Sequence, residues 1–501
     1  MPARRINAQS EQRRVLNSIK KSVTAHPWLC LALMLFWTWL NLAIQGPFFF
    51  PPVMLDSGFM FLTWSAPIAA SALAYFILSV GLKRTSRVFR EKWYIGSVAG
   101  LMAIGALLCF LWIQVFGAAL DTIPGIVLYI SGSIAIGFGT ALLMIEWGRI
   151  FGYLGPQEVL YQGIVAMLCS AVLVGALSFA PIIVGQLIFV LVPIPLAICL
   201  YRALCDLPRK NLYQHGLDAT LKVPNKFLIT AFLHGLSLGV LFGSLLVIGD
   251  QATGSLFAAI SFVIAALLLL LTALFVKMDF NHLIYQIGFG ITATGAFLIA
   301  IIADVPLVGI SFQLVGFCYV HLVMWGLCSY LTKNFRLPAI WVVSLPTCCL
   351  MIGQLLGGNI SNILTQRPDM FYWIQIMAMV MVFVLLMASL FMFSNRNLTT
   401  GWGLVLPSQR LTSDSSLESV AQQLTIENNI TPREAEIFLL MARGRNRRVI
   451  SEELVVSEET IKSHINSIYR KLDIHSQQEL LDLVEDYMAK LPDANPTTVF
   501  K

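Results

Sequence analysis

The side chains with the clearest chemical spacing lie between residues 457 and 472, in the segment SEETIKSHINSIYRKL. On a helix that turns about 100° per residue, one side of this segment is apolar and must face a core. The opposite side is small, polar and cationic, and it presents Ser463, Asn466, Ser467 and Arg470 with Lys462 on its flank. In the major groove of DNA, Asn pairs with adenine, and Lys or Arg with guanine or phosphate. The segment therefore predicts a DNA-reading helix face, although a merely solvated face has the same pattern.

Three more amphipathic helices are predicted around this one, so that four helices occupy residues 430–490. The first opens with a capping box at 431–434, with proline at its first position, and stops at Gly444. A short second helix covers about 447–454, and Ser457 caps the third, which reaches about Leu472. A second capping box at 476–479 opens the fourth. One side of that fourth helix is apolar and is predicted to pack or to form a dimer contact through Leu480, Leu481, Val484 and Met488.

The order of these motifs resembles the LuxR-type helix-turn-helix domain over about residues 430–488. The matching segments are TPREAE from Thr431, ARGR from Ala442, residues 457–472, and His475-Ser476. The resemblance implies a four-helix domain whose third helix enters the major groove of double-stranded DNA and whose fourth often dimerises. The positions that it assigns to the recognition helix are Thr460, Lys462, Ser463, His464 and Asn466, with Lys471 near the DNA backbone.

One segment departs from the family pattern. The family usually has Ser or Thr, then Asn and Lys, after its Gly-Arg pair, whereas this chain has Asn446, Arg447 and Arg448. The two arginines keep cationic phosphate contacts available, so they join the predicted DNA-binding residues. Residues 396–501 hold 12 Lys and Arg against 15 Asp and Glu. Affinity for DNA must therefore depend on where the cations stand rather than on net charge.

The first 395 residues have a composition suited to lipid. Only 12% of the whole chain is charged, against about 25% in soluble globular proteins, and the mean hydropathy is +0.77. A wholly soluble enzyme is thereby excluded. Because about 20 apolar residues cross a bilayer, we looked for runs of that length. Twelve are present, at about 28–48, 58–82, 93–117, 124–146, 159–179, 181–204, 227–249, 253–276, 282–303, 305–331, 338–359 and 371–394.

The connecting loops predict the orientation, because Lys and Arg mark the cytoplasmic side. Loops after the even-numbered runs carry Lys83, Arg84, Arg87, Arg90, Lys92, Arg149, Arg209, Lys210, Lys222, Lys226, Lys277, Lys333 and Arg336. Loops after the odd-numbered runs carry one cation, Arg367. We therefore predict a multi-pass protein of the cytoplasmic cell membrane with both termini in the cytoplasm. The first run is too long for a signal peptide and is predicted to be an uncleaved span.

The longest hydrophilic loop, at 205–226, divides the runs six and six. This arrangement resembles the major facilitator superfamily, which pairs two six-helix halves around a midplane site. The resemblance implies an all-α protein: a polytopic twelve-span helix bundle followed by the four-helix domain. The family loop between spans two and three usually includes an Asp. Here Gly81-Leu82-Lys83-Arg84 and Arg90-Glu91-Lys92 keep the basic part of that loop, and the Asp is missing.

The polar residues within the runs give little support to ion-coupled transport. Such transporters usually hold a charge near the midplane, and no Asp, Glu or Arg stands near the centre of a run. Glu146, three residues before Arg149, is predicted to form a local ion pair. The deep polar residues are neutral: Gln114, Gln162, Gln186, His234, Gln286, Gln313, His321 and Gln354. They predict either hydrogen bonds between helices or a pocket for an uncharged or aromatic molecule.

Five residues are the candidates for such a pocket. His321 and Trp325 are four residues apart and share one helix face. Gln313 and His234 join them if runs 227–249 and 305–331 line the same cavity. Asn41 belongs to a similar stripe in the first run. No catalytic residue, metal site or cofactor is predicted, because the nine cysteines show no metal spacing and no nucleophile stands with a base. We therefore do not expect an enzyme.

The predicted organisation is a basic N-terminus at 1–27, a membrane sensor domain at 28–395, a linker at 396–429, the DNA-binding domain at 430–490 and a tail at 491–501. No phospho-acceptor or soluble ligand domain stands between the two main parts, so a signal has to enter through the membrane helices. The arrangement resembles membrane-embedded LuxR-type regulators, which are implicated in responses to small molecules, aromatic ones included. We hypothesise a one-component transcriptional regulator that senses a small molecule in its bundle. The alternative is a major-facilitator-like transporter with a coupled regulatory domain.

Overall fold

The structure, a computed structural model, describes most of both predicted folded parts. The described residues are 2–45, 60–80, 93–118, 120–207, 223–248, 251–275, 280, 282–302, 306–335, 338–392, 420–421, 424–425 and 427–490. The predicted linker at 396–429 lies mostly outside them, and the tail at 491–501 wholly outside. Most of the loop cations used to predict the topology also lie outside the described residues.

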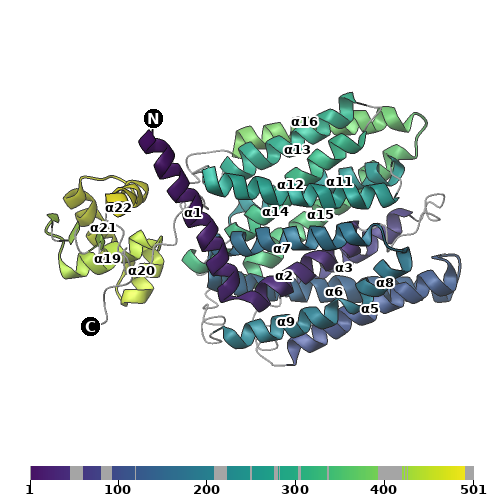
Figure 1. The fold of residues 1–501 in the computed structure, drawn as a ribbon, viewed down its shortest axis with the longest axis horizontal. Coiled ribbons are helices and arrows are strands. Elements are labelled where there is room, and N and C mark those ends of the chain that lie inside the picture. Colours follow the sequence, from purple (N-terminus) through teal and green to yellow (C-terminus); the bar gives the residue numbers. More distant parts are fainter. Residues whose placement is uncertain are drawn as a thin grey trace.

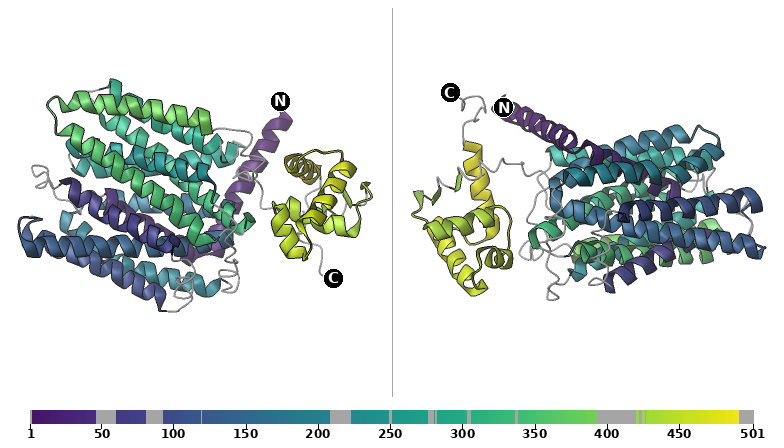
Figure 2. Two further views of the ribbon diagram at one scale, coloured as in Figure 1. Left: turned by 180° about the vertical axis from the view of Figure 1, so that it is seen from behind. Right: turned by 90° about the horizontal axis from the view of Figure 1, so that it is seen from below.

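Every regular element in these described ranges is helical, as the sequence predicts, and the helices form two bodies (Figure 1). A large bundle contains α2 to α16, and a small domain contains α19 to α22. Figure 2 shows the small domain beside one end of the bundle in two further views. We call this the proximal end and the opposite one the distal end.

The first half of the bundle corresponds to the first six predicted runs. Its elements are α2 (Pro27–Leu40), the π-helix η1 (Asn41–Gln45), α3 (Met60–Val80), α5 (Tyr94–Phe116), α6 (Ile123–Leu154), α7 (Pro156–Leu177), α8 (Ile182–Leu191) and α9 (Pro193–Asp206). Helices α8 and α9 divide the sixth run at Val192. The division has a local cause, because Pro193 and Pro195 cannot donate backbone hydrogen bonds to a continuing helix.

The second half corresponds to the last six runs. Its elements are α11 (Asn225–Ile248), α12 (Gln251–Phe275), the π-helix η3 (His282–Gly288), α13 (Phe289–Ile301), α14 (Pro306–Phe335), α15 (Ala339–Thr365) and α16 (Met370–Met392). Nine helices in the described part of the chain are long and apolar enough to cross a membrane. The described apolar parts of α3 and α11 are shorter, and α1 with α2 forms a bent pair. With these three, each of the twelve predicted runs contains a helix.

The sequence does not predict two features of the proximal end. The basic N-terminus forms a helix, α1 (Pro2–Ala25), which meets α2 at 92°. Pro27 begins α2, where a missing backbone N–H is tolerated. The amide of Gln162 in α7 donates to the carbonyl of Ser22 over 2.8 Å and ties the end of α1 to the bundle. The bend between α1 and α2 is therefore held by a residue of α7 that is distant in the sequence.

The second difference concerns Arg149, and the prediction that it lies in a loop is wrong. Helix α6 continues to Leu154, and Arg149 is buried within it. Its guanidinium lies 3.0 Å from the carboxylate of Glu146, which confirms the predicted ion pair. Since both charges are buried, each needs the other in place of water. The pair allows the helix to extend past the point at which its apolar sequence ends.

Small residues allow α11 and α15 to pack at close range. Gly235 and Gly239 face the backbone of α15 around Leu350 and Gln354, and a Cβ atom at either glycine would overlap carbonyl oxygens there. Gly353 and Gly357 of α15 face α11 in the same way. Both pairs have the four-residue spacing of small residues that lets membrane helices approach closely. Within the second half, this contact fixes α11 against α15.

The C-terminal domain has the four predicted helices: α19 (Pro432–Ala442), α20 (Arg447–Leu454), α21 (Glu458–Leu472) and α22 (Gln477–Lys490). The hydroxyl of Thr431 accepts from the backbone N–H of Glu434, and the Glu434 carboxylate accepts from the backbone N–H of Thr431. This is the predicted capping box. Gly444 follows α19 at φ +79°, a conformation that favours glycine. Local sequence therefore defines these helix ends.

Candidate nucleic-acid interface and membrane cavity

Helix α21 presents the predicted polar side to solvent. Ile461 and Ile468 are fully buried in the core of the domain, whereas Lys462, Ser463, Asn466 and Arg470 are exposed. Helix α21 starts at the predicted cap, because the hydroxyl of Ser457 accepts from the backbone N–H of Thr460 over 3.2 Å. His464 and Ser467 are half-buried on the flanks. The exposed side is thus small in its centre and cationic at its edge, which suits a groove of DNA.

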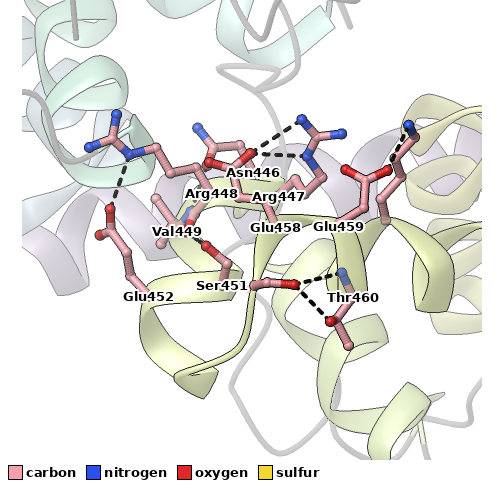
Figure 3. A network of polar contacts seen from close by, with 11 residues as sticks. Asn446, Arg447, Arg448, Val449, Ser451, Glu452, Glu458, Glu459 and Thr460 are labelled. Carbon is pink, nitrogen blue, oxygen red and sulfur yellow. Dashed lines mark hydrogen bonds and ion pairs between the residues drawn. The ribbon is translucent and has the colours of Figure 1, made fainter. Parts of the chain in front are cut away.

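Three cations of this surface are paired with carboxylates of the same domain (Figure 3). Arg447 in α20 lies 3.2 Å from Glu458 at the start of α21, and Arg448 lies 3.0 Å from Glu452 one turn away. On α21 itself, Lys462 lies 3.2 Å from Glu459. All three pairs are solvent-accessible, so each is worth little by itself. A DNA phosphate can therefore replace the carboxylate in each pair at small cost.

Lys471 is held differently. Its ammonium donates to the carboxylate of Glu434 over 2.7 Å and to the carbonyl of Asn429 over 2.9 Å. Burial of Glu434 raises its pKa, but hydrogen bonds from Lys471, from Thr431 and from Ser467 outweigh that effect and bring the pKa to about 2. Lys471 and Ser467 thus join α21 to the start of α19. Of the predicted DNA-binding residues, these two have a visible part in holding the domain together.

The departure at 446–448 has a structural role. The side-chain oxygen of Asn446 accepts from the backbone N–H of Val449 over 2.9 Å, so Asn446 is the N-cap of α20. Asn is among the best residues for this position. The two arginines therefore stand in the first turn of α20, next to the start of α21 (Figure 3). Asn446, Arg447 and Arg448 thus differ from the usual family sequence, but they still form a capped helix start that carries two cations.

The bundle contains a cavity between its two halves, with about 1210 Å³ of empty space, part of it open to solvent. Residues from both halves line it, among them Phe36, Trp37, Asn41, Tyr75, Thr140, Phe317, His321 and Gln354. Among the described residues that line it, none is Asp, Glu, Lys or Arg. They belong to the middle and distal parts of their helices. The lining is thus apolar and aromatic, with a few neutral polar groups, as expected of a small-molecule site.

The five predicted pocket residues have three different positions. Asn41 and His321 line the cavity. His234 and Trp325 lie behind it in an aromatic cluster: the His234 ring stacks on Phe317 with centroids 4.1 Å apart, and Trp325 lies 5.0 Å from Trp37. Helices α11 and α14 do line the same cavity, through Leu238 and Phe317 among others, although His234 itself does not. Gln313 does not line the cavity. Its amide donates to the carbonyl of Ser237 in α11 over 3.2 Å, so it forms a hydrogen bond between helices, the other role predicted for the deep polar residues.

Two cavity residues were not among the candidates, although their polar atoms need partners. The indole Nε1 of Trp37 and the amide Nε2 of Gln354 are buried without a hydrogen-bond partner among the described residues, and so is Nδ1 of His321. A buried unpaired donor costs about 1–3 kcal/mol, so such donors favour a ligand that accepts hydrogen bonds. Several of the other deep polar residues are about as buried, so only the cavity lining and the hydrogen-bond partners distinguish Trp37 and Gln354 from them. Sequence spacing reports neither.

The two halves are joined by hydrogen bonds at the proximal end. The hydroxyl of Ser329 donates to the carbonyl of Phe151 over 2.7 Å, and the ammonium of Lys333 donates to the carbonyl of Leu154 over 3.2 Å. The indole of Trp341 donates to the carbonyl of Ser79 over 3.0 Å. In addition, Gly152 of α6 touches the side chain of Thr332 of α14. We call these contacts the proximal gate. They lie on the proximal side of the residues that line the cavity.

Comparison with known proteins assigns the C-terminal domain. The family described as "Bacterial regulatory proteins, luxR family" matches residues 428–484. These residues are a LuxR-type DNA-binding domain. The chain is 36% identical over 64 residues to the uncharacterized response regulatory protein YgeK of Escherichia coli, covering 13% of this chain and 44% of that protein. It is 34% identical over 65 residues to the transcriptional regulatory protein LiaR of Bacillus subtilis, covering 13% and 31%. The chain thus spans less than half of these relatives.

The bundle resembles solved transporters in fold. A bacterial homologue of the iron transporter ferroportin, in an outward-facing state, superposes with a TM-score of 0.52 at 13% identity, over 74% of this chain and 99% of that one. The Escherichia coli fucose:proton symporter FucP gives a TM-score of 0.45 at 16% identity, over 75% and 100%. The first of these likenesses shows that the membrane part of this chain shares the fold of the ferroportin homologue. At these identities, the likeness concerns the fold alone.

Proposed function

We propose that this chain is a membrane-embedded, one-component transcriptional regulator. A small molecule binds in the bundle and controls how the LuxR-type domain engages double-stranded DNA. The observation that carries the proposal is the cavity itself: among the described residues its lining has unpaired polar groups and no Asp, Glu, Lys or Arg, in a chain that also contains a DNA-binding domain. A transport function would leave the second domain unexplained.

The chemistry of the cavity favours an uncharged ligand. A charged ligand would need a counter-ion, because the cost of moving a charge out of water is large, and the lining supplies none. Trp37, Phe317 and His321 offer ring faces, which suit a flat or aromatic molecule. Trp37 and Gln354 offer N–H donors to a hydroxyl, ether or carbonyl oxygen. We therefore expect a neutral, ring-containing inducer that bears oxygen.

The proposed orientation follows from the loop charges. The proximal end, which the LuxR-type domain contacts, faces the cytoplasm, and the protein lies in the cytoplasmic cell membrane with both termini inside. This is the side on which DNA is available. We propose that the chain acts as a homodimer through its C-terminal domain, since paired LuxR-type domains match paired half-sites on DNA. An alkaline phosphatase fused after Lys501 tests the orientation: strong activity there would place the DNA-binding domain outside the cell.

The fold supports one alternative, a transporter with a coupled regulatory domain. Major-facilitator-like halves are built for alternating access around a central site, and this bundle has two such halves with a cavity between them. In the regulator that we propose, the same two arrangements are signalling states. Ligand must favour one of them by about 5.5 kcal/mol to move a population from 1:99 to 99:1.

One experiment on paired samples separates the two functions. Transcripts are compared between a strain with this chain and a deletion strain, over a panel of neutral oxygen-bearing ring compounds, and uptake of the active compound is measured in proteoliposomes. The proposed regulator gives a compound-dependent transcript change that requires the chain and shows no concentrative uptake. Concentrative uptake of the active compound that requires the chain would establish the transporter with a coupled regulatory domain instead, whether or not transcripts change.

A further inference from the structure

The DNA-binding domain is attached to the bundle by a specific contact. Arg445, in the turn between α19 and α20, donates from its Nη1 atom to the carbonyl of Lys333 over 2.6 Å. The guanidinium Nε atom of Arg445 is also shielded from solvent. Figure 1 and Figure 2 show the domain against the proximal end, where α14 finishes. The contact therefore joins the LuxR-type domain to the last turn of a single helix.

The chemistry of this contact is favourable on both sides. The last four carbonyls of a helix have no partner within the helix, and the carbonyl of Lys333 is one of them because α14 ends at Phe335. These carbonyls are also the negative end of the helix dipole, where a cation is stabilised. Arg445 thus caps α14 from another domain. The acceptor is a backbone oxygen, so it moves whenever the end of α14 moves.

The same turn of α14 holds the proximal gate. The ammonium of Lys333 bonds the carbonyl of Leu154, Thr332 packs against Gly152, and Ser329 bonds the carbonyl of Phe151. Opening the proximal end requires α14 and α6 to separate at these contacts. Such a movement displaces the carbonyl that Arg445 binds. These three gate contacts and the domain contact therefore depend on one segment, residues 329–335, whereas the fourth gate contact, between Trp341 and Ser79, joins α15 to α3.

Helix α14 connects the cavity directly to that segment. Phe317, Cys318 and His321 line the cavity, and Lys333 lies twelve residues beyond His321. At about 1.5 Å per residue, the separation is about 18 Å along a helix that is unbroken from Pro306 to Phe335. A ligand that shifts the cavity face of α14 thus moves its proximal end as well.

The contact also lies next to the start of α20, where the predicted phosphate contacts stand. Arg445 immediately precedes the Asn446 cap, and the predicted phosphate contacts Arg447 and Arg448 stand in the following turn. A domain held against the bundle through Arg445 presents this edge to the proximal end rather than to a duplex. Contact with α14 and contact with DNA should therefore compete.

We propose that the proximal gate is a docking site for the chain's own DNA-binding domain, in which Arg445 binds the end of α14 and keeps the domain from DNA until the gate opens. The inference rests on the proposed function, because it states how the cavity controls that domain. It assigns Arg445 to regulation. The exposed residues of α21 remain responsible for reading the sequence.

A reversible cross-link tests the docking. Cysteines are placed at Arg445 and at Asn334, beside the acceptor, so that Lys333 stays intact, and the full chain in nanodiscs is treated with a bis-methanethiosulfonate reagent. The duplex probe is selected from a random-sequence pool by the reduced full chain. We expect cross-linking to weaken binding of this duplex by about 5- to 150-fold, the usual range of coupling between two sites, and reduction to restore it. The single-cysteine chains, which contain the native exposed Cys169 and Cys205, are the controls.

The outcomes are separable. A reduced chain that selects no duplex refutes the proposed DNA-binding function, and this inference with it. A chain that selects a duplex but forms no 334–445 cross-link refutes the docking alone. A cross-linked chain that binds the duplex as well as the reduced chain refutes the inhibitory role of the contact.

Single substitutions give an independent measurement without cross-linking. Arg445→Gln removes the guanidinium that caps α14, whereas Arg443→Gln removes a charge from an exposed residue in the same turn. Without inducer, we expect Arg445→Gln to bind the selected duplex several-fold more tightly than the native chain, and Arg443→Gln to show no such gain. Equal or weaker binding by Arg445→Gln in chains that elute as folded protein would contradict the proposal.

Discussion

The membrane bundle and the LuxR-type domain satisfy their polar groups in opposite ways. In the domain, cations pair with carboxylates that are mostly near in sequence, such as Arg448 with Glu452 and Lys462 with Glu459. In the bundle, neutral side chains reach across helices to backbone carbonyls, as Ser329 does to Phe151. Some neutral groups at the cavity have no partner. The domain is thus suited to exchange its counter-ions for a polyanion, and the bundle to accept a neutral molecule.

The largest expected effect concerns the exposed side of α21. Lys462→Ala combined with Asn466→Ala should weaken specific duplex binding about 100-fold, since a good base contact is worth about 1–3 kcal/mol. Gel shifts with the selected duplex measure it, and Gln478→Ala on α22 is the control. Full sequence-specific binding by the double variant would show that Lys462 and Asn466 do not contact the bases and that the exposed side of α21 is not the DNA-reading surface.

The second effect concerns the stability of the domain in acid. Because the pKa of Glu434 is lowered to about 2, its ionised form stabilises the fold above the unfolded pKa, and that stability is lost as the pH falls toward 2. Glu434→Gln should cost roughly 1–3 kcal/mol at neutral pH and flatten the dependence below pH 5. Hydrogen exchange of residues 432–472 in the full chain measures both changes. An unchanged acid profile in Glu434→Gln would place the sensitive group elsewhere.

The third effect tests the neutral character of the bundle. Trp37→Phe keeps a ring at the cavity and removes its N–H donor, so it should weaken the response to an active compound by about 2- to 10-fold, the worth of one neutral hydrogen bond. The dose–response of a reporter measures this, with Trp373→Phe, outside the cavity lining, as the matched control. If the two variants respond alike, the unpaired indole of Trp37 does not recognise the ligand.

The smallest effect concerns the turn between α20 and α21. Val455 has φ +53° and is 90% exposed, and a β-branched residue in the left-handed region is strained. Val455→Gly should therefore stabilise the domain by about 0.5–1 kcal/mol after the entropic cost of glycine. Asn429→Gly, at φ +52°, is the control and should be nearly neutral, because asparagine tolerates this region. Thermal unfolding of the domain checks both variants, and a loss of stability in Val455→Gly would refute the strain.

Much of the fold could be predicted because its signals are local. The cap at Ser457 and the capping box of Thr431 and Glu434 mark helix ends by hydrogen bonds within four residues. The features that the sequence did not predict depend on the packing of the bundle. Helix α1 turns where Gln162 of α7 holds Ser22, 140 residues away. Glu146 and Arg149 are only three residues apart, but both are buried because other helices surround the end of α6.

The candidate sites divide in the same way. For α21, the apolar period of the helix decides which side is buried, so the exposed residues follow from the sequence. For the cavity, the sequence supplies the deep neutral residues and cannot rank them. Gln313 and Gln354 look equivalent along the chain, yet Gln313 bonds Ser237 while Gln354 lines the cavity with an unpaired amide nitrogen.

By itself, the sequence determined twelve apolar runs, four C-terminal helices with caps for three of them, and the polar side of α21, because helix periodicity and capping depend on residues within a few turns. Tertiary structure alone decided which neutral side chains meet at the cavity, which carbonyls close the proximal gate and that Arg445 reaches the end of α14. Those contacts join residues more than a hundred positions apart, such as Lys333 with Leu154 and Arg445 with Lys333. Their partners are backbone carbonyls, which every residue carries, so only the packing of the helices selects them.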